Sequence, residues 1–168
     1  MLGVIRRGFE NLSPKIFCIL YATFVRPHLE YAQSVWSPKL RKCVNLIEGV
    51  QRRATRLVHR YRELTYEQRL QRLELPSLEF RRHFGDMVQI YKNLHLYDRE
   101  TVADKLNQGA RPSRRQNFEL LPNFASDGSR GVQTKSFYYR CISAWNDLPR
   151  DVVAAQSIKA FKERLNEA

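Results

Sequence analysis

The chain has 168 residues, of which 43% are hydrophobic, and it carries a formal net charge of +12 at pH 7. That hydrophobic content is enough to build a core, so it excludes a wholly disordered chain and suits one domain or two small ones. No apolar run reaches the roughly 18 to 20 residues of a membrane helix, and the N-terminus lacks the apolar length and cleavage site of a signal peptide.

The basic excess favours a polyanionic partner, because a compact chain of this charge repels itself unless counter-charges screen it. Nucleic acid is the first candidate, an anionic membrane surface the second, and an ordinary basic soluble protein the third. The cysteines Cys18, Cys43 and Cys141 are odd in number and widely spaced, which supports neither a disulfide framework nor a zinc site. We expect reduced thiols in an intracellular protein, nuclear or cytoplasmic.

Helix signals begin at Ser13-Pro14, where a capping hydroxyl precedes a proline at the first helical position. The apolar run from Ile16 to Val25 follows, and Pro27 should stop or kink that helix. A second short helical segment is expected from His28 to Trp36.

The clearest predicted element is a helix from Pro38 to His59. Apolar residues recur there at alternating steps of three and four, from Leu40 to Leu57. A rotation of about 100° per residue gathers basic side chains on the opposite side, namely Arg41, Lys42, Arg52, Arg53, Arg56 and Arg60. Residues 38–72 contain ten basic and three acidic residues, a net charge of +7, so the positive charge is concentrated in a stripe.

Further along, Thr65 to Gln68 has the pattern of a capping box and opens a short helix closed by Pro76. Ser77 should cap another helix, in which Leu78, Met87, Tyr91 and other apolar residues keep helical spacing. Glycines, prolines and basic clusters predict a loop after it, with one short strand at 118–121. Helical spacing returns near Phe137, and a last helix starts at Ser157. The predicted fold is mainly α: a helical bundle over 1–96, a basic loop or linker over 97–135, and a small C-terminal helical unit over 136–168.

No catalytic centre can be assigned from the residues. A polymerase or nuclease needs two or three carboxylates that converge on divalent metal, yet the sequence contains no Asp-Asp pair. The scattered aspartates are typical of helix caps and turns. Glycine-rich phosphate loops and metal-binding histidine spacings are also missing. We therefore expect no catalytic residue, no metal and no cofactor in this chain.

The basic stripe is the main functional feature of the sequence. Guanidinium groups suit phosphate oxygens, and each neutralised phosphate releases condensed counterions. The alternative is a solvated face with Glu–Arg pairs, but only Glu48, Glu63 and Glu67 lie nearby. Because the stripe is helical and rich in arginine, phosphate positioning is expected rather than base reading. Tyr61, between Arg60 and Arg62, is the candidate for base stacking, whereas core packing is expected for Tyr21, Phe24, Tyr31, Trp36, Tyr91 and Trp145.

Several blocks occur in a fixed order: residues 20–32, 35–38, 47–48, 50–56, 64–70, 73–78, 145–149 and 161–165. Together they resemble the region that follows the palm in LINE-type, jockey-like reverse transcriptases of non-LTR retrotransposons. The resemblance covers nearly the whole chain and implies a thumb and connection that grips the template-primer duplex behind the active site. The family's activity is RNA-directed DNA synthesis, but its catalytic aspartates lie upstream of the matched blocks and have no counterpart here. What carries over is Val50 to Arg56, which falls on the basic stripe.

The expected function is a nucleic-acid-binding accessory region of a retrotransposon reverse transcriptase, without the palm. It would grip the phosphates of an RNA or DNA template-primer duplex through Arg41, Lys42, Arg52, Arg53, Arg56, Arg60, Tyr61 and Arg62. An upstream palm domain is a further candidate partner, and no membrane partner is expected. Two alternatives stay open: a fragment whose basic face meets acidic protein or anionic lipid, and an inert retrotransposon remnant.

Overall fold

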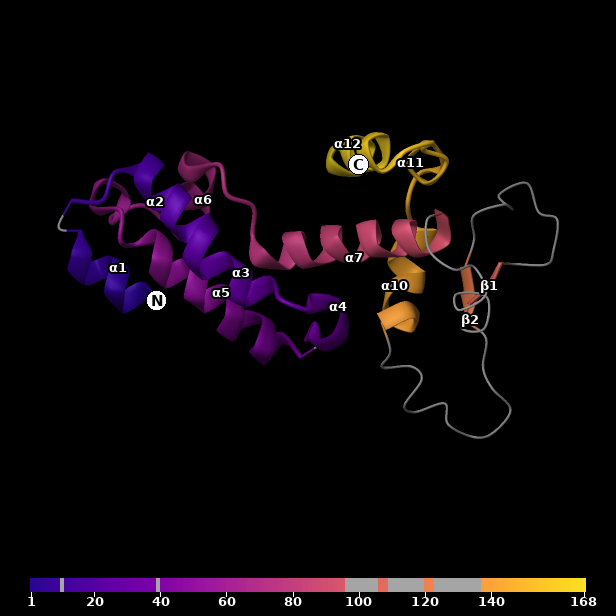
Figure 1. Cartoon of the computed structure of the whole chain (residues 1–168), viewed down its shortest axis with the longest axis horizontal. Helices are drawn as coiled ribbons and strands as arrows, with labels where there is room; N and C mark the ends of the chain where they lie inside the picture. The colour runs from indigo at the N-terminus through magenta and orange to yellow at the C-terminus, as the bar shows by residue number, and fades with distance from the viewer. Residues whose placement is uncertain (10, 39, 96–105, 109–119, 123–136) are drawn as a thin grey trace. The chain divides into compact units, whose positions relative to one another are not determined.

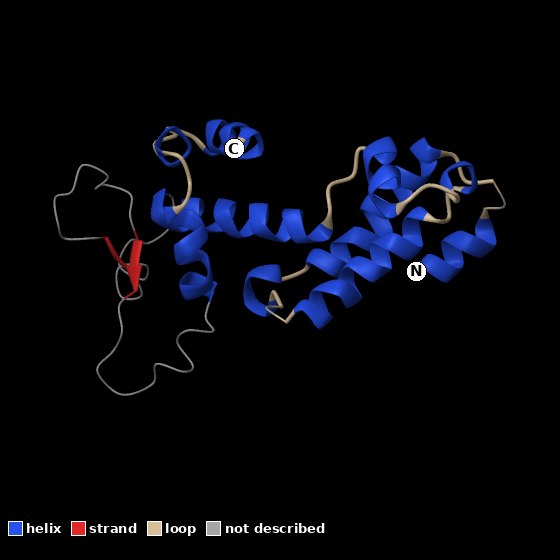
Figure 2. Ribbon diagram, turned by 180° about the vertical axis from the view of Figure 1, so that it is seen from behind, coloured by secondary structure: helices blue, strands red, loops and turns tan. Residues whose placement is uncertain are grey.

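The computed structural model describes residues 1–9, 11–38, 40–95, 106–108, 120–122 and 137–168, and it is mainly helical, as predicted (Figures 1 and 2). Its residues form two compact units, Met1–Arg82 and His83–Ala168. The division therefore falls inside a helix, whereas the sequence placed it at residue 96. The difference arises because the apolar residues in the second half of that helix are part of the C-terminal core.

Unit 1 is built of short helices around one longer helix, all seen in Figure 1. In chain order they are α1 (Leu2–Gly8), α2 (Pro14–Leu20), the π-helical η1 (Tyr21–Val25), α3 (Arg26–Glu30), α4 (Gln33–Trp36), α5 (Arg41–Thr55), the 3₁₀ segment η2 (His59–Tyr61), α6 (Tyr66–Leu73) and the first residues of α7 (Leu78–His95). The sequence reading did not predict α1.

The predicted helix starts are confirmed by their capping bonds. The Ser13 hydroxyl accepts from the Ile16 backbone N–H at 3.4 Å, and the Ser77 hydroxyl accepts from the Phe80 N–H at 3.1 Å. In the capping box of α6, the Thr65 hydroxyl accepts from the Gln68 N–H at 3.3 Å, while the Gln68 side chain accepts from the Thr65 N–H at 2.9 Å. These signals are local, which is why the sequence alone could identify them.

Of the two outcomes predicted for Pro27, a stop or a kink, the stop does not occur, because the helical path continues through the proline into α3. A π-helical turn precedes the proline, with the Arg26 N–H bonded to the Tyr21 carbonyl five residues back. Proline is tolerated at the start of a helix because its missing N–H is not needed there, and Pro27 lies in the first turn of α3.

The helix predicted over 38–59 is shorter at both ends, since α5 spans Arg41–Thr55. Its last turn tightens, with the Leu57 N–H bonded to the Ala54 carbonyl at 2.9 Å, and Val58 continues in an extended conformation. The Val58 side chain is fully buried in the core of unit 1. Tertiary packing rather than a glycine or proline therefore ends the helix, so no local signal marks the boundary.

The core of unit 1 joins its helices to one another. It consists of Ile5, Leu12, Phe17, Tyr21, Val25, Ala54, Val58 and Leu73. Phe17 and Tyr21 stack with their ring centroids 5.6 Å apart. The burial predicted for Phe24, Tyr31 and Trp36 is wrong, because all three side chains are exposed. Phe24 lies outside the side of η1 that faces the core, where Tyr21 and Val25 are buried, and Tyr31 and Trp36 belong to the segment 31–36, which contributes no residue to that core.

Unit 2 contains the second half of α7, the antiparallel strands β1 (Leu106–Gln108) and β2 (Leu120–Pro122), and the helices α10 (Phe137–Asn146), α11 (Arg150–Val153) and α12 (Ile158–Glu167). Its core is aromatic: the Tyr91 ring stacks on Phe161 at 4.4 Å, and Trp145 lies 5.9 Å from the same ring. Tyr91 and Trp145 are buried, as predicted.

Two further contacts hold unit 2 together. The Asn146 amide bonds both backbone groups of Leu120, accepting from its N–H at 2.9 Å and donating to its carbonyl at 3.0 Å, which attaches β2 to α10. The last helix begins at Ser157, as predicted, with its hydroxyl accepting from the Ala160 N–H at 3.2 Å. The strand predicted at 118–121 overlaps β2, and most of the predicted 97–135 loop lies outside the described residues.

Candidate nucleic-acid interface

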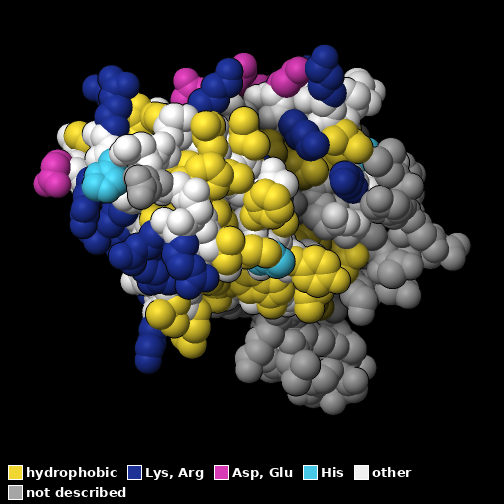
Figure 3. Space-filling model, turned by 60° about the vertical axis from the view of Figure 1, so that its left-hand side comes forward, with side chains coloured by type: hydrophobic (Ala, Val, Ile, Leu, Met, Phe, Trp, Pro, Cys, Tyr) yellow, Lys and Arg dark blue, Asp and Glu magenta, His cyan; other side chains and the backbone are white. Residues whose placement is uncertain are grey.

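The exposed face of α5 carries four of the predicted contact residues. Lys42, Arg52, Arg53 and Arg56 are all exposed, and within the part of the chain that the structure describes none of them forms an ion pair with a carboxylate. Figure 3 shows one face of the molecule, on which Lys and Arg side chains gather beside an apolar area. Lys42 and Arg56 are about 21 Å apart along the helix axis, at roughly 1.5 Å per residue. That length corresponds to about six nucleotides of a duplex strand.

Arg41 departs from the predicted stripe. Its guanidinium forms two hydrogen bonds to the Glu79 carboxylate of α7, at 2.8 and 3.0 Å, so its charge is compensated inside the protein. Both side chains are largely exposed, at 71% and 53%, and such surface pairs contribute little to stability. Glu79 lies 38 residues from Arg41, and a count of nearby glutamates therefore missed it.

Arg60, which was predicted on the basic side of the helix, lies beyond the end of α5, as do the other two predicted contact residues, Tyr61 and Arg62. Arg60 and Tyr61 belong to η2, and Arg62 follows it. The two arginines are exposed. The Tyr61 ring is half-buried and packs against the core of unit 1, which leaves only part of it accessible to a nucleic-acid base.

One cation of α5, Arg52, contacts α6. The Arg52 guanidinium lies over the ring of Tyr66, with its central carbon 4.9 Å from the ring centroid. The same ring receives Arg69, at 5.9 Å. Arg69 is buried and donates to the Thr55 hydroxyl at 3.0 Å, across from the end of α5. Burial, followed by the positive charge of Arg56, lowers the pKa of Arg69.

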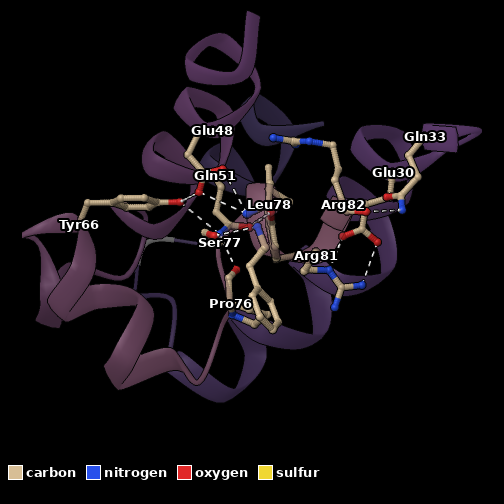
Figure 4. Close-up of polar contacts among 12 residues, drawn as sticks. Glu30, Gln33, Glu48, Gln51, Tyr66, Pro76, Ser77, Leu78, Arg81 and Arg82 are labelled. Atoms are coloured by element: carbon tan, nitrogen blue, oxygen red, sulfur yellow. Dashed lines mark hydrogen bonds and ion pairs between the residues drawn. The ribbon is translucent and has the colours of Figure 1, made fainter. Parts of the chain in front are cut away.

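A neighbouring side of α5 also carries polar residues, but these are buried (Figure 4). The Glu48 carboxylate accepts from the Leu78 N–H at 3.1 and 3.3 Å and from the Tyr66 hydroxyl. The Gln51 amide donates to the Tyr66 oxygen at 3.1 Å and to the Pro76 carbonyl at 3.0 Å, and its oxygen accepts from the Tyr21 hydroxyl. Glu48 was expected near the stripe as a potential counter-charge. Its inward orientation leaves the exposed cations without it.

Figure 4 also shows two arginines of α7 with different surroundings. Arg81 forms a bidentate pair with Glu30, with one of its bonds at 2.9 Å, and the other through Nε. The hydrogen bond to Glu30 raises the pKa of Arg81. Arg82 is buried, and neither terminal nitrogen of its guanidinium has a hydrogen-bond partner among the described residues. The sequence offered no signal to separate these adjacent residues.

A groove lies between α1 and the end of α5, and we call it the α1–α5 groove. It has a volume of about 730 Å³. Its polar lining comes from Arg6, Arg53, Arg56 and Arg62 together with Glu63 and His59. Aliphatic side chains of α1 and of the chain on either side of it line the rest. Arg53 and Arg56 thus belong both to the basic face of α5 and to this groove. The sequence reading could not find it, because α1 itself was not predicted.

Other kinds of site find no support in the described residues. Among them, no three His, Cys, Asp or Glu side chains are grouped closely enough to hold a metal ion. The same residues contain no helix with both the length and the apolar character needed to cross a bilayer. Cys18, Cys43 and Cys141 form no disulfide with one another, and burial, followed by the charge of Glu74, raises the pKa of the Cys18 thiol. A protonated thiol is a weak nucleophile and a weak metal ligand.

In comparisons with known proteins, no protein-family model, no curated protein and no solved structure matches the chain.

Proposed function

We propose that the chain is a nucleic-acid-binding accessory region of a retrotransposon reverse transcriptase, which holds the phosphates of a template-primer duplex without supplying catalytic residues. The observation that supports it is the set of exposed cations on one face of α5, Lys42, Arg52, Arg53 and Arg56, which have no carboxylate partner within the described residues. Such cations repel one another, and a row of phosphates is the ligand that relieves this repulsion over a length of about 21 Å.

The contact is expected to depend on the backbone of the nucleic acid rather than on its sequence. Arginine and lysine on an exposed helix face bind phosphate oxygens, whereas base recognition needs side chains placed in a groove at fixed hydrogen-bonding geometry. The cation–π contact with Tyr66 restricts Arg52, so less side-chain entropy is lost when it binds. Arg41 contributes less than predicted, since Glu79 already neutralises it.

The test is the triple variant Arg52→Gln, Arg53→Gln and Arg56→Gln, measured by fluorescence anisotropy with a duplex and an RNA–DNA hybrid. Binding should weaken, and the slope of log K against log salt should shrink by about 0.9 for each lost phosphate contact. The charge-matched control is Lys15→Gln, Lys159→Gln and Lys162→Gln, which removes three exposed cations from α2 and α12. Equal loss in both variants, or no loss in the first, would refute the proposal.

A second candidate function is favoured by exposed apolar side chains in unit 1. Ile19, Phe24, Val35 and Leu46 are between 46% and 82% exposed, which is unusual for large apolar residues. These residues suit a protein partner, such as a palm domain, that would cover them. Analytical ultracentrifugation of the full chain mixed with a palm domain tests this reading: formation of a complex would support it, and separate sedimentation of the two proteins would argue against it.

A further inference from the structure

The α1–α5 groove adds Arg6 and Arg62 to two arginines, Arg53 and Arg56, that the proposed function already uses. Four arginines and one glutamate line it, and Arg6 and Arg62 lie outside the basic face of α5. We propose that this groove binds the terminal phosphate of a nucleic-acid strand, with the terminal nucleoside resting on the apolar part of its lining. The proposal rests on the proposed function, because a strand held along α5 would reach the groove at the C-terminal end of that helix.

The positive charge of four arginines is concentrated in the groove. An internal phosphodiester carries one negative charge, whereas a terminal phosphate monoester carries about 1.5 to 2 at pH 7 and offers three acceptor oxygens. Four guanidiniums offer more donors than one phosphodiester can accept. A ligand group with two charges matches them better than the evenly spaced single charges along a duplex.

Part of the groove lining is apolar. Leu2, Ile5, Leu12 and Leu57 contribute aliphatic surface, and Phe9 adds a ring that is 43% exposed. A site for phosphate alone would not need this surface, whereas a nucleoside has a flat base that packs on aliphatic and aromatic groups. The volume of about 730 Å³ falls within the range of roughly 300 to 1,000 Å³ that small-ligand sites occupy.

The groove lies next to the exposed face of α5. Arg53 and Arg56 line the groove and also belong to the exposed face of α5. A strand whose phosphates follow α5 therefore ends at, or passes over, the groove. A terminal nucleotide can enter it, because it is not constrained by a following phosphate. An acidic amphipathic peptide would also match an apolar and basic surface, but each of its carboxylates carries a single charge. A peptide bound in the groove would also not explain why Arg53 and Arg56 lie both in the groove and on the basic face of α5.

The test uses the full chain and hairpin duplexes with short single-stranded extensions that end in a 5′-phosphate, a 3′-phosphate or a hydroxyl. Affinity is measured by fluorescence anisotropy with the label in the hairpin loop. At least one phosphate-ended hairpin should bind about tenfold more tightly than its hydroxyl-ended counterpart. The two phosphate arms decide which strand end the groove receives.

The decisive variant is Arg6→Ala, because Arg6 lines the groove and does not belong to α5. It should abolish the preference for the phosphate end and leave the affinity for the hydroxyl-ended hairpin unchanged. Its matched control is Arg7→Ala, which removes an equally exposed neighbour that does not line the groove, and which should keep the preference. Circular dichroism of both variants checks that α1 still folds.

Several outcomes overturn the inference. No phosphate preference in the wild type, a preference that survives Arg6→Ala, or one that Arg7→Ala removes equally would each do so. Binding of an acidic amphipathic peptide that Arg6→Ala weakens, without any phosphate preference, would make the groove a peptide site instead. The hydroxyl-ended hairpin separates the two proposals. If it does not bind, the proposed function fails. If it binds normally and no hairpin end is preferred, only the proposed phosphate site in the groove is refuted. A nucleoside monophosphate, too short to follow α5, reports on the groove alone.

Discussion

On α5, Arg52, Arg53 and Arg56 are exposed, whereas Glu48, Gln51 and Thr55 are at most 9% exposed. Both groups are polar, and their residues belong to α5, except that Arg56 is the C-cap that directly follows it. The exposed group has no carboxylate partner within the described residues, while each buried residue has a hydrogen-bond partner on another segment or on α5 itself. The comparison shows that the two polar faces of this helix have separate roles: one stabilises unit 1, and the other is available to a ligand.

The difference between the two faces has a simple electrostatic origin. A buried carboxylate is stable only when hydrogen-bond donors replace its lost water, and Glu48 receives them from Leu78 and Tyr66. Exposed guanidiniums keep their water and need no such partner. Each of the substitutions below tests whether a polar residue stabilises the fold, as Glu48 does, or is free to contact a ligand, as the exposed arginines are.

The largest effect is expected for Glu48→Ala. It leaves the Leu78 N–H and the Tyr66 hydroxyl without their acceptor inside unit 1. We expect the free energy of unfolding to fall by about 3 kcal/mol, because each unsatisfied buried donor costs about 1 to 3 kcal/mol. Urea denaturation followed by circular dichroism measures it. Arg53→Ala on the exposed face of the same helix is the control and should change stability by less than about 0.5 kcal/mol. Similar losses in both variants would contradict the separation of the two faces.

The roles of these faces show what the sequence could and could not predict. The helical period correctly predicted that Lys42, Arg52, Arg53 and Arg56 share an exposed face, because a regular rotation per residue is a local property. It could not predict that Glu48 faces inward, since the donors that make this possible lie 18 and 30 residues away. One residue predicted on the apolar, buried side of the helix is also misplaced, since Leu40 is 71% exposed.

The ends of the helices could likewise be predicted where neighbouring residues determine them, and could not where residues distant in the sequence do. Caps at Ser13, Thr65 and Ser157 were predicted, because a hydroxyl and a backbone N–H three residues apart are sufficient. The end of α5 at Thr55 was not, because the burial of Val58 ends the helix there. The short helices α1 and α11 were missed, as their few apolar positions give no clear period. The nucleic-acid function stays a prediction.

The next largest effect compares a buried ion pair with an exposed one. Asp86 and Arg140 are only 9% and 11% exposed and form two hydrogen bonds of 3.1 Å in unit 2. Asp86→Ala leaves a largely buried guanidinium without this acceptor, so we expect a loss of about 2 kcal/mol. Glu79→Ala breaks the exposed pair with Arg41 and should cost less than about 0.5 kcal/mol. Thermal unfolding of the two variants, side by side, measures the difference, and the ranking is contradicted if Glu79→Ala is the more damaging.

A smaller effect, which depends on pH, is expected at Tyr66. Burial, followed by the hydrogen bond to Glu48, raises the pKa of Tyr66 above its ordinary value of 10.0. The folded state therefore holds the phenolic proton more tightly than the unfolded chain. The resulting stabilisation is fully present below pH 10 and is lost as the pH rises further, toward the folded pKa.

Tyr66→Phe should lower the free energy of unfolding at pH 7 by about 1.5 kcal/mol, because the hydroxyl bonds to a charged group. Above pH 10 its stability should fall less steeply than that of the wild type, since one proton is no longer linked to unfolding. Urea denaturation at several pH values gives both quantities. Tyr31→Phe removes an exposed hydroxyl and is the matched control. Parallel pH profiles for wild type and Tyr66→Phe would show that the buried network does not hold this proton.

The smallest effect has the opposite sign and concerns Arg82, the buried residue that fits neither group. Its backbone carbonyl accepts from the Gln33 amide, but its terminal nitrogens have no partner among the described residues. Arg82→Met keeps most of the apolar stem and removes the unpaired donors, so stability should rise by about 1 kcal/mol. Arg81→Met, which breaks the pair with Glu30, should lower it instead. If Arg82→Met is also destabilising, the guanidinium has an acceptor in the folded protein, and Arg82 joins Arg69 and Arg81 among the structural arginines.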